Sequence, residues 1–300
     1  MRSCQLVLSV AILASAACGE RADNPETRQA GATSASASAK ATTLAKADDQ
    51  FVTAGDVRLR YRDVGQGTPI VFIHGYSRTL EDWTALADSF PANRVIAYDV
   101  RGFGKSSKFS DTRHYGAAMA EDVVALLDHL KIDRAHLVGH SMGALIAGNV
   151  AVRHPQRVAS ASLVAGPFYA DSVTFSRATA RWVRDLERGM GLSRFLPWLM
   201  PGTPDSLARG MSAETMRVND SVSMVTTMRS FGGLAITSKT MAAASVPVLV
   251  AVGGGDPLAP FSRTLAKQWP KAQLVDLPGV DHVQIINRPE VLAGMRAIMR

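Results

Sequence analysis

Cysteine is nearly absent from this sequence, with Cys4 and Cys18 the only two among 300 residues. Both lie close to the N-terminus, ahead of any segment with the composition of a folded domain. From residue 19 onward the chain therefore has no disulfide and no cysteine-based metal site. We expect the folded part to be stabilised by packing alone.

A basic stripe is lacking as well. Lysine and arginine outnumber aspartate and glutamate by 33 to 26, which gives a formal charge of +7, but the basic residues are scattered. The largest local excess, Arg58, Arg60 and Arg62, alternates along an expected strand and is interpreted as one solvated face. Nothing resembles a basic surface interleaved with aromatic residues, so we expect no nucleic-acid partner.

Long apolar runs are missing too. The run at residues 6–13 follows Arg2 and is too short to span a bilayer. Small residues come after it, so residues 1–18 are interpreted as a secretory signal peptide. We therefore expect an exported protein.

Two processing sites compete within this segment. Ala14-Ser15-Ala16 fits a small-x-small cleavage site that releases a soluble protein. Ser15-Ala16-Ala17-Cys18 resembles a bacterial lipobox, in which Cys18 becomes the lipidated first residue. Residues 19–47 are rich in Ala, Ser and Thr, a composition typical of a flexible tether. The protein is then either an envelope lipoprotein, held to the membrane through that lipid alone, or a periplasmic or secreted protein.

Residues 48–300 have the pattern of an α/β domain. Residues 51–53 and 57–61 suit a hairpin, and residues 119–130 show helical periodicity. Continuous apolar runs typical of buried strands stand at residues 69–73 and 95–98, and residues 137–138, 161–164, 246–252 and 273–277 are expected to supply further strands. Because helical patterns separate most of these runs, we predict a mostly parallel sheet with flanking helices.

One long insertion interrupts the alternation. Residues 167–244 contain no buried-strand pattern and are instead amphipathic and rich in methionine and aromatic residues. An insertion of this length between two strands is interpreted as a helical cap over the carboxyl edge of the sheet. We expect most of its apolar side chains to form the cap's own core and a minority to line a pocket.

The pentapeptide Gly139-His140-Ser141-Met142-Gly143 carries the main functional signal. It follows an apolar run and opens a stretch of helical composition, which places Ser141 at the apex of a sharp strand-to-helix turn. Such a turn holds the serine hydroxyl clear of the backbone, and small neighbours let strand and helix pack closely. We interpret Ser141 as a nucleophile.

A serine nucleophile needs a base and an acid, and both follow later strands. Asp256 comes just after residues 248–252, and His282 follows residues 273–277. Loops at the carboxyl ends of parallel strands converge on one crevice. Asp281 is the neighbouring alternative to Asp256, but its adjacency to His282 points its side chain elsewhere.

Backbone donors are expected to form an oxyanion hole. One is the Met142 N–H at the start of the helix after the nucleophile. The other is the Tyr76 N–H in the loop after residues 69–73, where Gly75 makes the turn. His74 is interpreted as a structural brace of this loop.

Five motifs together resemble the capped, esterase-like group of the α/β-hydrolase fold family over residues 50–300. They are His74-Gly75, residues 99–106, residues 139–143, Gly255-Asp256-Pro257 and residues 279–282. The resemblance implies an eight-stranded, mostly parallel sheet, a helical cap inserted after the sixth strand, and a triad of Ser141, Asp256 and His282. It gives the loop at residues 99–104 no catalytic role.

The resemblance implies hydrolysis of small, apolar esters, lactones or thioesters without a metal or organic cofactor. Related enzymes that use an aspartate nucleophile are disfavoured because Ser141 occupies that position. Carbon–carbon bond hydrolysis and cofactor-free perhydrolase activity remain alternatives on the same fold. A non-catalytic ligand-binding protein is the alternative from another class. The sequence does not indicate an oligomeric state.

Overall fold

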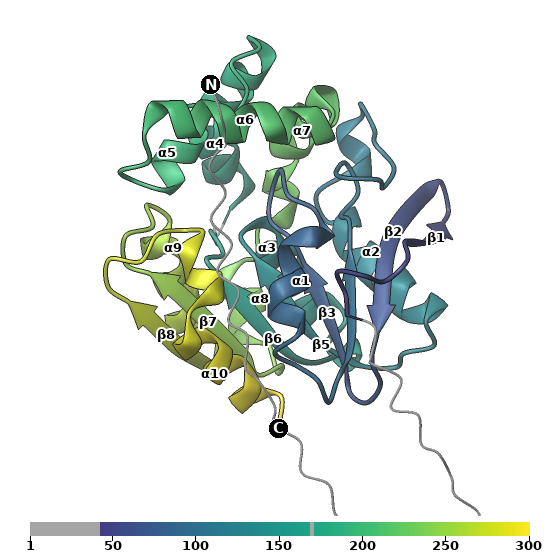
Figure 1. Cartoon of the computed structure of the whole chain (residues 1–300). Coiled ribbons are helices and arrows are strands. Elements are labelled where there is room, and N and C mark those ends of the chain that lie inside the picture. The colour runs from purple at the N-terminus through teal and green to yellow at the C-terminus, as the bar shows by residue number, and fades with distance from the viewer. Residues whose placement is uncertain (1–42, 169–170) are drawn as a thin grey trace, which may run out of the picture. The chain divides into compact units, whose positions relative to one another are not determined.

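The computed structural model describes residues 43–168 and 171–300 (Figure 1). The predicted signal peptide, Cys18 and the tether up to residue 42 lie outside the described residues. No helix within the described residues is long and apolar enough to cross a membrane.

Eight strands of the described residues form one sheet in the order β1-β2-β4-β3-β5-β6-β7-β8. β2 runs antiparallel to β1 and β4, and the other neighbouring pairs are parallel. The predicted α/β class with a mostly parallel sheet is confirmed. The strands are β1 (Gln50–Ala54), β2 (Val57–Val64), β3 (Pro69–Ile73), β4 (Arg94–Tyr98), β5 (Ala135–His140), β6 (Val158–Val164), β7 (Val248–Gly253) and β8 (Ala272–Leu277).

Helices cover both faces of this sheet, and β3 shows why its residues are apolar throughout. Ile70 and Phe72 pack into one core layer, while Val71 and Ile73 pack into the other. A strand buried on both faces has no position for a polar side chain, so it appears in the sequence as a continuous apolar run. The helices outside the cap are α1 (Thr84–Ala87), α2 (Ala118–His129), α3 (Met142–Arg153), α9 (Ala259–Gln268) and α10 (Pro289–Ile298).

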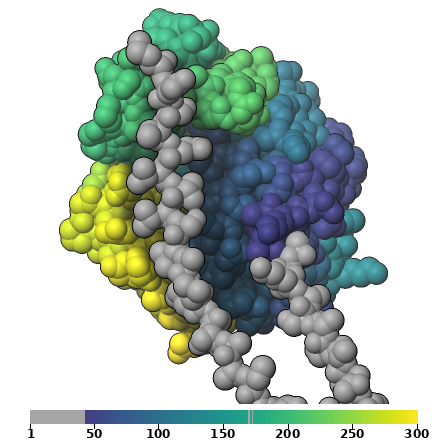
Figure 2. Space-filling view, in the orientation of Figure 1, coloured from purple at the N-terminus to yellow at the C-terminus, as the bar shows by residue number. Residues whose placement is uncertain are grey.

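The insertion between β6 and β7 is helical, as predicted. Helices α4 to α7 stand above the edge of the sheet at which the parallel strands end (Figure 1), and they form the upper, green part of the surface in Figure 2. α8 instead packs against α9 of the core. The inserted helices are α4 (Ser172–Glu187), α5 (Phe195–Leu199), α6 (Asp205–Val218), α7 (Ser221–Arg229) and α8 (Ser238–Ala242).

Short 3-10 helices occupy several connections. They are η1 (Leu80–Trp83), η2 (Thr112–His114), η3 (Pro155–Arg157), η4 (Phe231–Leu234) and η5 (Gln284–Asn287).

Packing of the domain begins before the expected boundary at residue 48. Leu44 is completely buried in the core layer that contains Ile70 and Phe72. Asp49 pairs with Arg60 at 2.6 Å and with Arg62 at 2.9 Å. Leu44 therefore fixes the end of the segment interpreted as a tether, and Asp49 holds the first residues of the domain.

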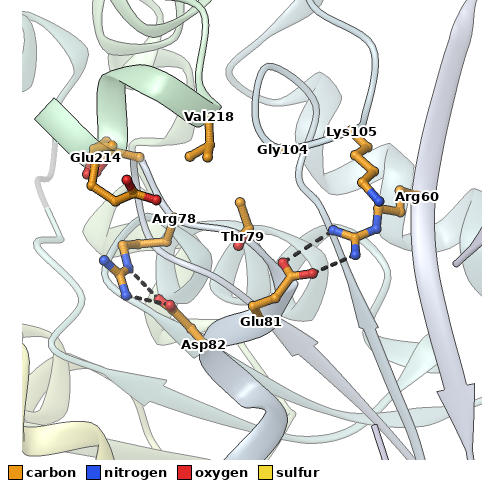
Figure 3. Close-up of a pocket in the computed structure, with 11 residues that line it drawn as sticks. Arg60, Arg78, Thr79, Glu81, Asp82, Gly104, Lys105, Glu214 and Val218 are labelled. Atoms are coloured by element: carbon orange, nitrogen blue, oxygen red, sulfur yellow. Dashed lines mark hydrogen bonds and ion pairs between the residues drawn. The ribbon is translucent and has the colours of Figure 1, made fainter. Parts of the chain in front are cut away.

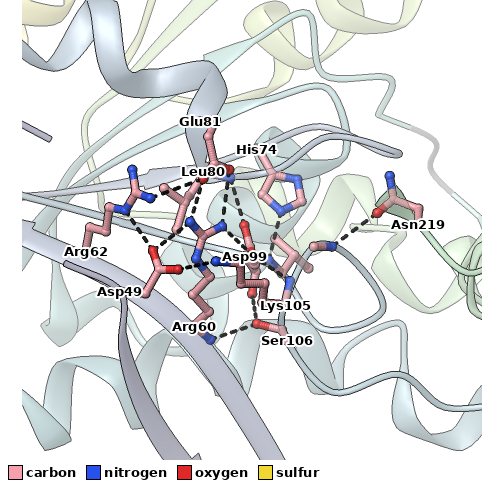
Figure 4. A network of polar contacts seen from close by, with 12 residues as sticks. Asp49, Arg60, Arg62, His74, Leu80, Glu81, Asp99, Lys105, Ser106 and Asn219 are labelled. Atoms are coloured by element: carbon pink, nitrogen blue, oxygen red, sulfur yellow. Dashed lines mark hydrogen bonds and ion pairs between the residues drawn. The ribbon is translucent and has the colours of Figure 1, made fainter. Parts of the chain in front are cut away.

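The prediction of a solvated arginine face on β2 is wrong for Arg60. Its side chain is 3% exposed and pairs with Glu81 at 2.5 Å and Asp99 at 3.1 Å, in addition to Asp49 (Figure 4). The loop after β4 covers it: Asp99 N–H donates to the Arg60 carbonyl, and Arg60 N–H donates to Ser106 Oγ. The alternation of Arg58, Arg60 and Arg62 indicates that they share one face of β2, but it does not reveal that the loop after β4 covers Arg60.

Candidate active site

Ser141 lies in the turn between β5 and α3 with a strained backbone. Its φ is 54° and its ψ is −114°, and its N–H donates to the Val164 carbonyl at 2.8 Å. Such a conformation costs on the order of 1–3 kcal/mol in a non-glycine residue. A β-carbon at Gly143 would collide with the Ile73 carbonyl, and one at Gly139 would collide with the Gly143 carbonyl. The two glycines are therefore required for β5 and α3 to approach closely enough to form this turn.

Asp256 and His282 form a buried hydrogen-bonded pair. The distance from His282 Nδ1 to Asp256 Oδ2 is 2.7 Å, and the residues are 2% and 4% exposed. The second carboxylate oxygen of Asp256 accepts the Leu258 N–H at 2.8 Å. Asp256 is therefore held from both sides, and the imidazole carries its Nδ1 proton toward the carboxylate. His282 Nε2 remains as the acceptor.

The alternative acid, Asp281, is used elsewhere. Its Oδ1 accepts the N–H groups of Val283 and Gln284 at 2.9 and 2.7 Å, so it caps the turn after His282. The prediction that adjacency would turn Asp281 away agrees with this geometry.

Ser141 and His282 line one cavity of about 200 Å³. Ser141 follows β5, Asp256 follows β7 and His282 follows β8, so the three predicted residues meet at the carboxyl edge of the sheet. Ser141 is thereby brought to two residues that lie more than 100 positions further along the chain.

The two expected oxyanion donors lie beside Ser141. A β-carbon at Gly75 would stand 3.3 Å from Ser141 Cβ, so the loop after β3 runs directly against the serine. Met142 is the first residue of α3. Within residues 43–168 and 171–300, neither the Tyr76 N–H nor the Met142 N–H donates to a backbone carbonyl. Neither amide is therefore used in a backbone hydrogen bond among these residues.

His74 braces the loop that carries Tyr76. Its Nε2 accepts the Val100 N–H at 2.9 Å, and its Nδ1 contacts the Gly75 carbonyl at 2.8 Å. The residue is completely buried, which lowers the pKa of its imidazole and keeps it neutral. The neighbouring carboxylate of Asp99 accepts the Leu80 and Lys105 N–H groups (Figure 4). These bonds connect the loop at residues 99–106 to the segment that follows β3.

His140 belongs to the site and was not predicted from the sequence. Its Nε2 contacts the His282 carbonyl oxygen at 2.8 Å, so its proton lies on that nitrogen. Burial, followed by the nearby charge of His282, lowers the pKa of His140 to about 4, and the ring is neutral near pH 7. Since its partner is a backbone oxygen, no residue pattern could have revealed the contact.

Ser141 also lines a second cavity of about 440 Å³ beneath the cap. His282 does not line this cavity. Aromatic and aliphatic side chains form most of its wall, from Tyr76, Phe175, Trp182, Phe195, Trp198 and Phe231. The serine therefore stands at the junction of two cavities.

A third, polar pocket of about 480 Å³ adjoins the first cavity (Figure 3). The two share Ser77, Arg78 and Asp82. Its charged walls are largely paired: Arg78 binds Asp82 at 2.5 Å and Arg60 binds Glu81 at 2.5 Å. None of the three predicted triad residues lines this pocket.

No group of three or more His, Cys, Asp or Glu side chains in the described residues is placed to hold a metal ion.

The chain belongs to the α/β-hydrolase fold family. The alpha/beta hydrolase fold family model matches residues 68–191. Over 263 residues the chain is 30% identical to the dihydrolipoyllysine-residue acetyltransferase component of the acetoin cleaving system of Pseudomonas putida. The aligned region covers 84% of this chain and 69% of that protein.

Two further proteins show the range of the similarity. The chain is 35% identical over 111 residues to a 2-hydroxymuconate semialdehyde hydrolase from Pseudomonas sp. (strain CF600) and spans 39% of that relative's length. A thermophilic esterase from Thermogutta terrifontis superposes with a TM-score of 0.70 at 25% identity, covering 85% of this chain and 98% of that one. These similarities identify a hydrolase of this fold but not its particular reaction.

Proposed function

We propose that this protein hydrolyses carboxylic esters, lactones or thioesters through an acyl-enzyme on Ser141. The observation that carries the proposal is the buried Asp256–His282 hydrogen bond, which lies beside a strained serine that opens onto an apolar cavity. Similarity to an esterase over nearly the whole of that chain supports it.

The expected mechanism uses these groups in two half-reactions. His282 Nε2 removes the proton from Ser141 Oγ as the oxygen attacks the substrate carbonyl. Asp256 holds the ring and stabilises its cationic form. The Tyr76 and Met142 N–H groups hold the oxyanion. His282 then gives the proton to the leaving alcohol, and water repeats the sequence on the acyl-enzyme.

The test is pre-steady-state hydrolysis of p-nitrophenyl butyrate. We expect a burst of one nitrophenolate per active site and a loss of activity on the order of 10⁴-fold or more in Ser141→Ala. Ser162→Ala is the control, because Ser162 Oγ is buried with no partner among the described residues. Equal rates for wild type and Ser141→Ala would overturn the proposal.

Carbon–carbon bond hydrolysis is the second candidate, supported by the identity to the semialdehyde hydrolase. The same serine and histidine would serve it. Measuring kcat/KM on a vinylogous diketone and on matched phenyl esters separates the two, since the proposed esterase favours the esters. The same panel with a carboxylic acid and hydrogen peroxide measures perhydrolase activity.

Export is proposed from the first 18 residues, with Cys18 as the lipidation candidate. Intact mass of the mature protein decides between the two processing sites. A diacylglyceryl mass on Cys18 would establish the lipoprotein, and an unmodified start at Ala17 would establish release.

A further inference from the structure

The charged side chains that line the 440 Å³ cavity are all arginines. Arg177, Arg181 and Arg184 reach it from α4, whereas no aspartate or glutamate of the described residues lines it. Spacings of four and three place the three residues on one face of the helix. The cavity that begins at Ser141 is therefore bordered by positive charge at the cap.

These arginines lack carboxylate partners within the described part of the chain. The two carboxylates within α4 bind other arginines: Asp185 pairs with Arg194 at 3.2 Å, and Glu187 pairs with Arg229. The carboxylate of Asp171 interacts electrostatically with Arg177, but it is used to cap α4, where it accepts the Thr174 N–H at 2.7 Å. The positive charge at the cavity is thus not neutralised by an ion pair.

Arg181 is also held in place. Its guanidinium carbon lies 4.0 Å from the centroid of the Trp182 ring and 5.0 Å from that of Trp198. Stacking on aromatic faces orients a guanidinium while leaving the N–H groups at its edge free to bind an anion. Both tryptophans line the cavity as well.

The position of His282 shows which part of a substrate enters this cavity. His282 must reach the leaving group to protonate it, and it lines the 200 Å³ cavity but not the larger one. The leaving group therefore departs through the smaller cavity. The acyl part then occupies the larger, aromatic cavity and extends toward α4.

We propose that the substrate is an ester whose acyl chain is apolar beside the ester carbonyl and carries a carboxylate at its far end, which Arg177, Arg181 and Arg184 bind. This inference rests on the proposed esterase function and narrows its substrate class. It makes Arg181 the main specificity residue, because aromatic rings fix its orientation.

The test compares two series of p-nitrophenyl esters with equal chain lengths from six to ten carbons. One series is the mono-esters of dicarboxylic acids, and the other is the esters of the corresponding fatty acids. The readout is the ratio of kcat/KM for the anionic ester to that for the neutral ester. In Arg181→Gln we expect this ratio to fall roughly five-fold or more, mainly through KM, because one charge-assisted contact is lost.

Matched variants separate binding from general effects of charge. Arg188→Gln removes the same charge just past the end of α4 from a side chain that does not line the cavity, and should leave the ratio within two-fold. Arg181→Lys keeps the charge but loses the planar stack, and should retain part of the preference. Raising the ionic strength from 0.02 to 0.5 M should lower the wild-type ratio.

An equal ratio in wild type and Arg181→Gln would overturn the inference, as would an equal fall in Arg188→Gln. Failure of the esterase proposal has a different signature, because Ser141→Ala would then retain hydrolysis of both series.

Discussion

The charged side chains on the sheet side of Ser141 are paired, whereas those at the cavity on the cap side have no carboxylate partner among the described residues. On the sheet side, Asp256 binds His282, Asp99 binds Arg60, and Arg101 binds Asp122 at 2.5 Å, all of them buried. On the cap side, the cavity wall is aromatic and its arginines have no carboxylate partner in the described residues.

The contrast follows from the cost of burying charge. A buried ion without a partner costs several kcal/mol, so the charged groups of the sheet side must be paired, and pairing also fixes their positions. Arg177, Arg181 and Arg184 are exposed, so leaving them unpaired costs little. The sheet side can thus hold the reacting atoms rigidly, while the cap side keeps charge available for a ligand.

The largest expected effect is a loss of activity when the Asp256–His282 pair on the sheet side is disrupted. Asp256→Asn should lower kcat for p-nitrophenyl esters by about 10⁴-fold, because the amide cannot hold the His282 tautomer or stabilise its cation. Steady-state kinetics with circular dichroism as a folding control checks this. A loss of less than ten-fold would show that Asp256 is not the acid of the triad.

The next effect concerns stability. Asp99→Asn removes a carboxylate that neutralises Arg60 and accepts the Leu80 and Lys105 N–H groups. We expect the free energy of unfolding to fall by about 3 kcal/mol. Urea denaturation measures it, with Asp111→Asn as an exposed control expected to leave it nearly unchanged. Similar losses in both variants would contradict the pairing argument.

A smaller effect appears as a pH dependence. The pKa of His140 is lowered to about 4 in the folded protein, whereas an unfolded histidine titrates near 6.5. Between these values the unfolded chain binds the extra proton, so stability is lost as pH falls from 7 toward 4.

His140→Gln removes this titration and keeps an N–H donor for the His282 carbonyl. Between pH 7 and pH 5 the variant should lose about 2 kcal/mol less stability than wild type. His74, whose pKa is also lowered by burial, contributes equally to both proteins. Parallel stability curves for wild type and variant would rule out a neutral, buried His140.

The smallest effect tests the connection between the two sides. The Tyr76 hydroxyl donates to the Met224 carbonyl of α7 at 2.9 Å, which joins the loop after β3 to the cap. Tyr76→Phe should cost about 1 kcal/mol of stability. Since the backbone of residue 76 is unchanged, a large loss of kcat with little loss of stability would mean that the hydroxyl, rather than the amide, acts at the site.

The sheet, the cap and the positions of Ser141, Asp256 and His282 followed from local patterns. β3 and β7 are apolar throughout because both faces are buried, and the turn at Ser141 requires glycine on both sides for close packing. Features of this kind leave a signature within a few residues of the sequence. The catalytic roles of the three residues remain predictions.

What could not be predicted depends on distant partners. Arg60 is buried because the loop after β4 covers it, and His140 matters because a backbone oxygen 142 residues away faces it. Pro197 lies inside a helix rather than between two, as the third residue of α5. The first turn of a helix leaves its N–H groups unpaired, so a proline there breaks no hydrogen bond.

Covalent labelling of the nucleophile tests the central claim most directly. A p-nitrophenyl alkylphosphonate presents a tetrahedral phosphorus to the serine, and its phosphonyl group remains on the attacking atom. Intact mass and peptide mapping should find one adduct per chain, on the peptide containing Ser141, and none in Ser141→Ala. An adduct on another residue, or full esterase activity after complete labelling, would contradict the account.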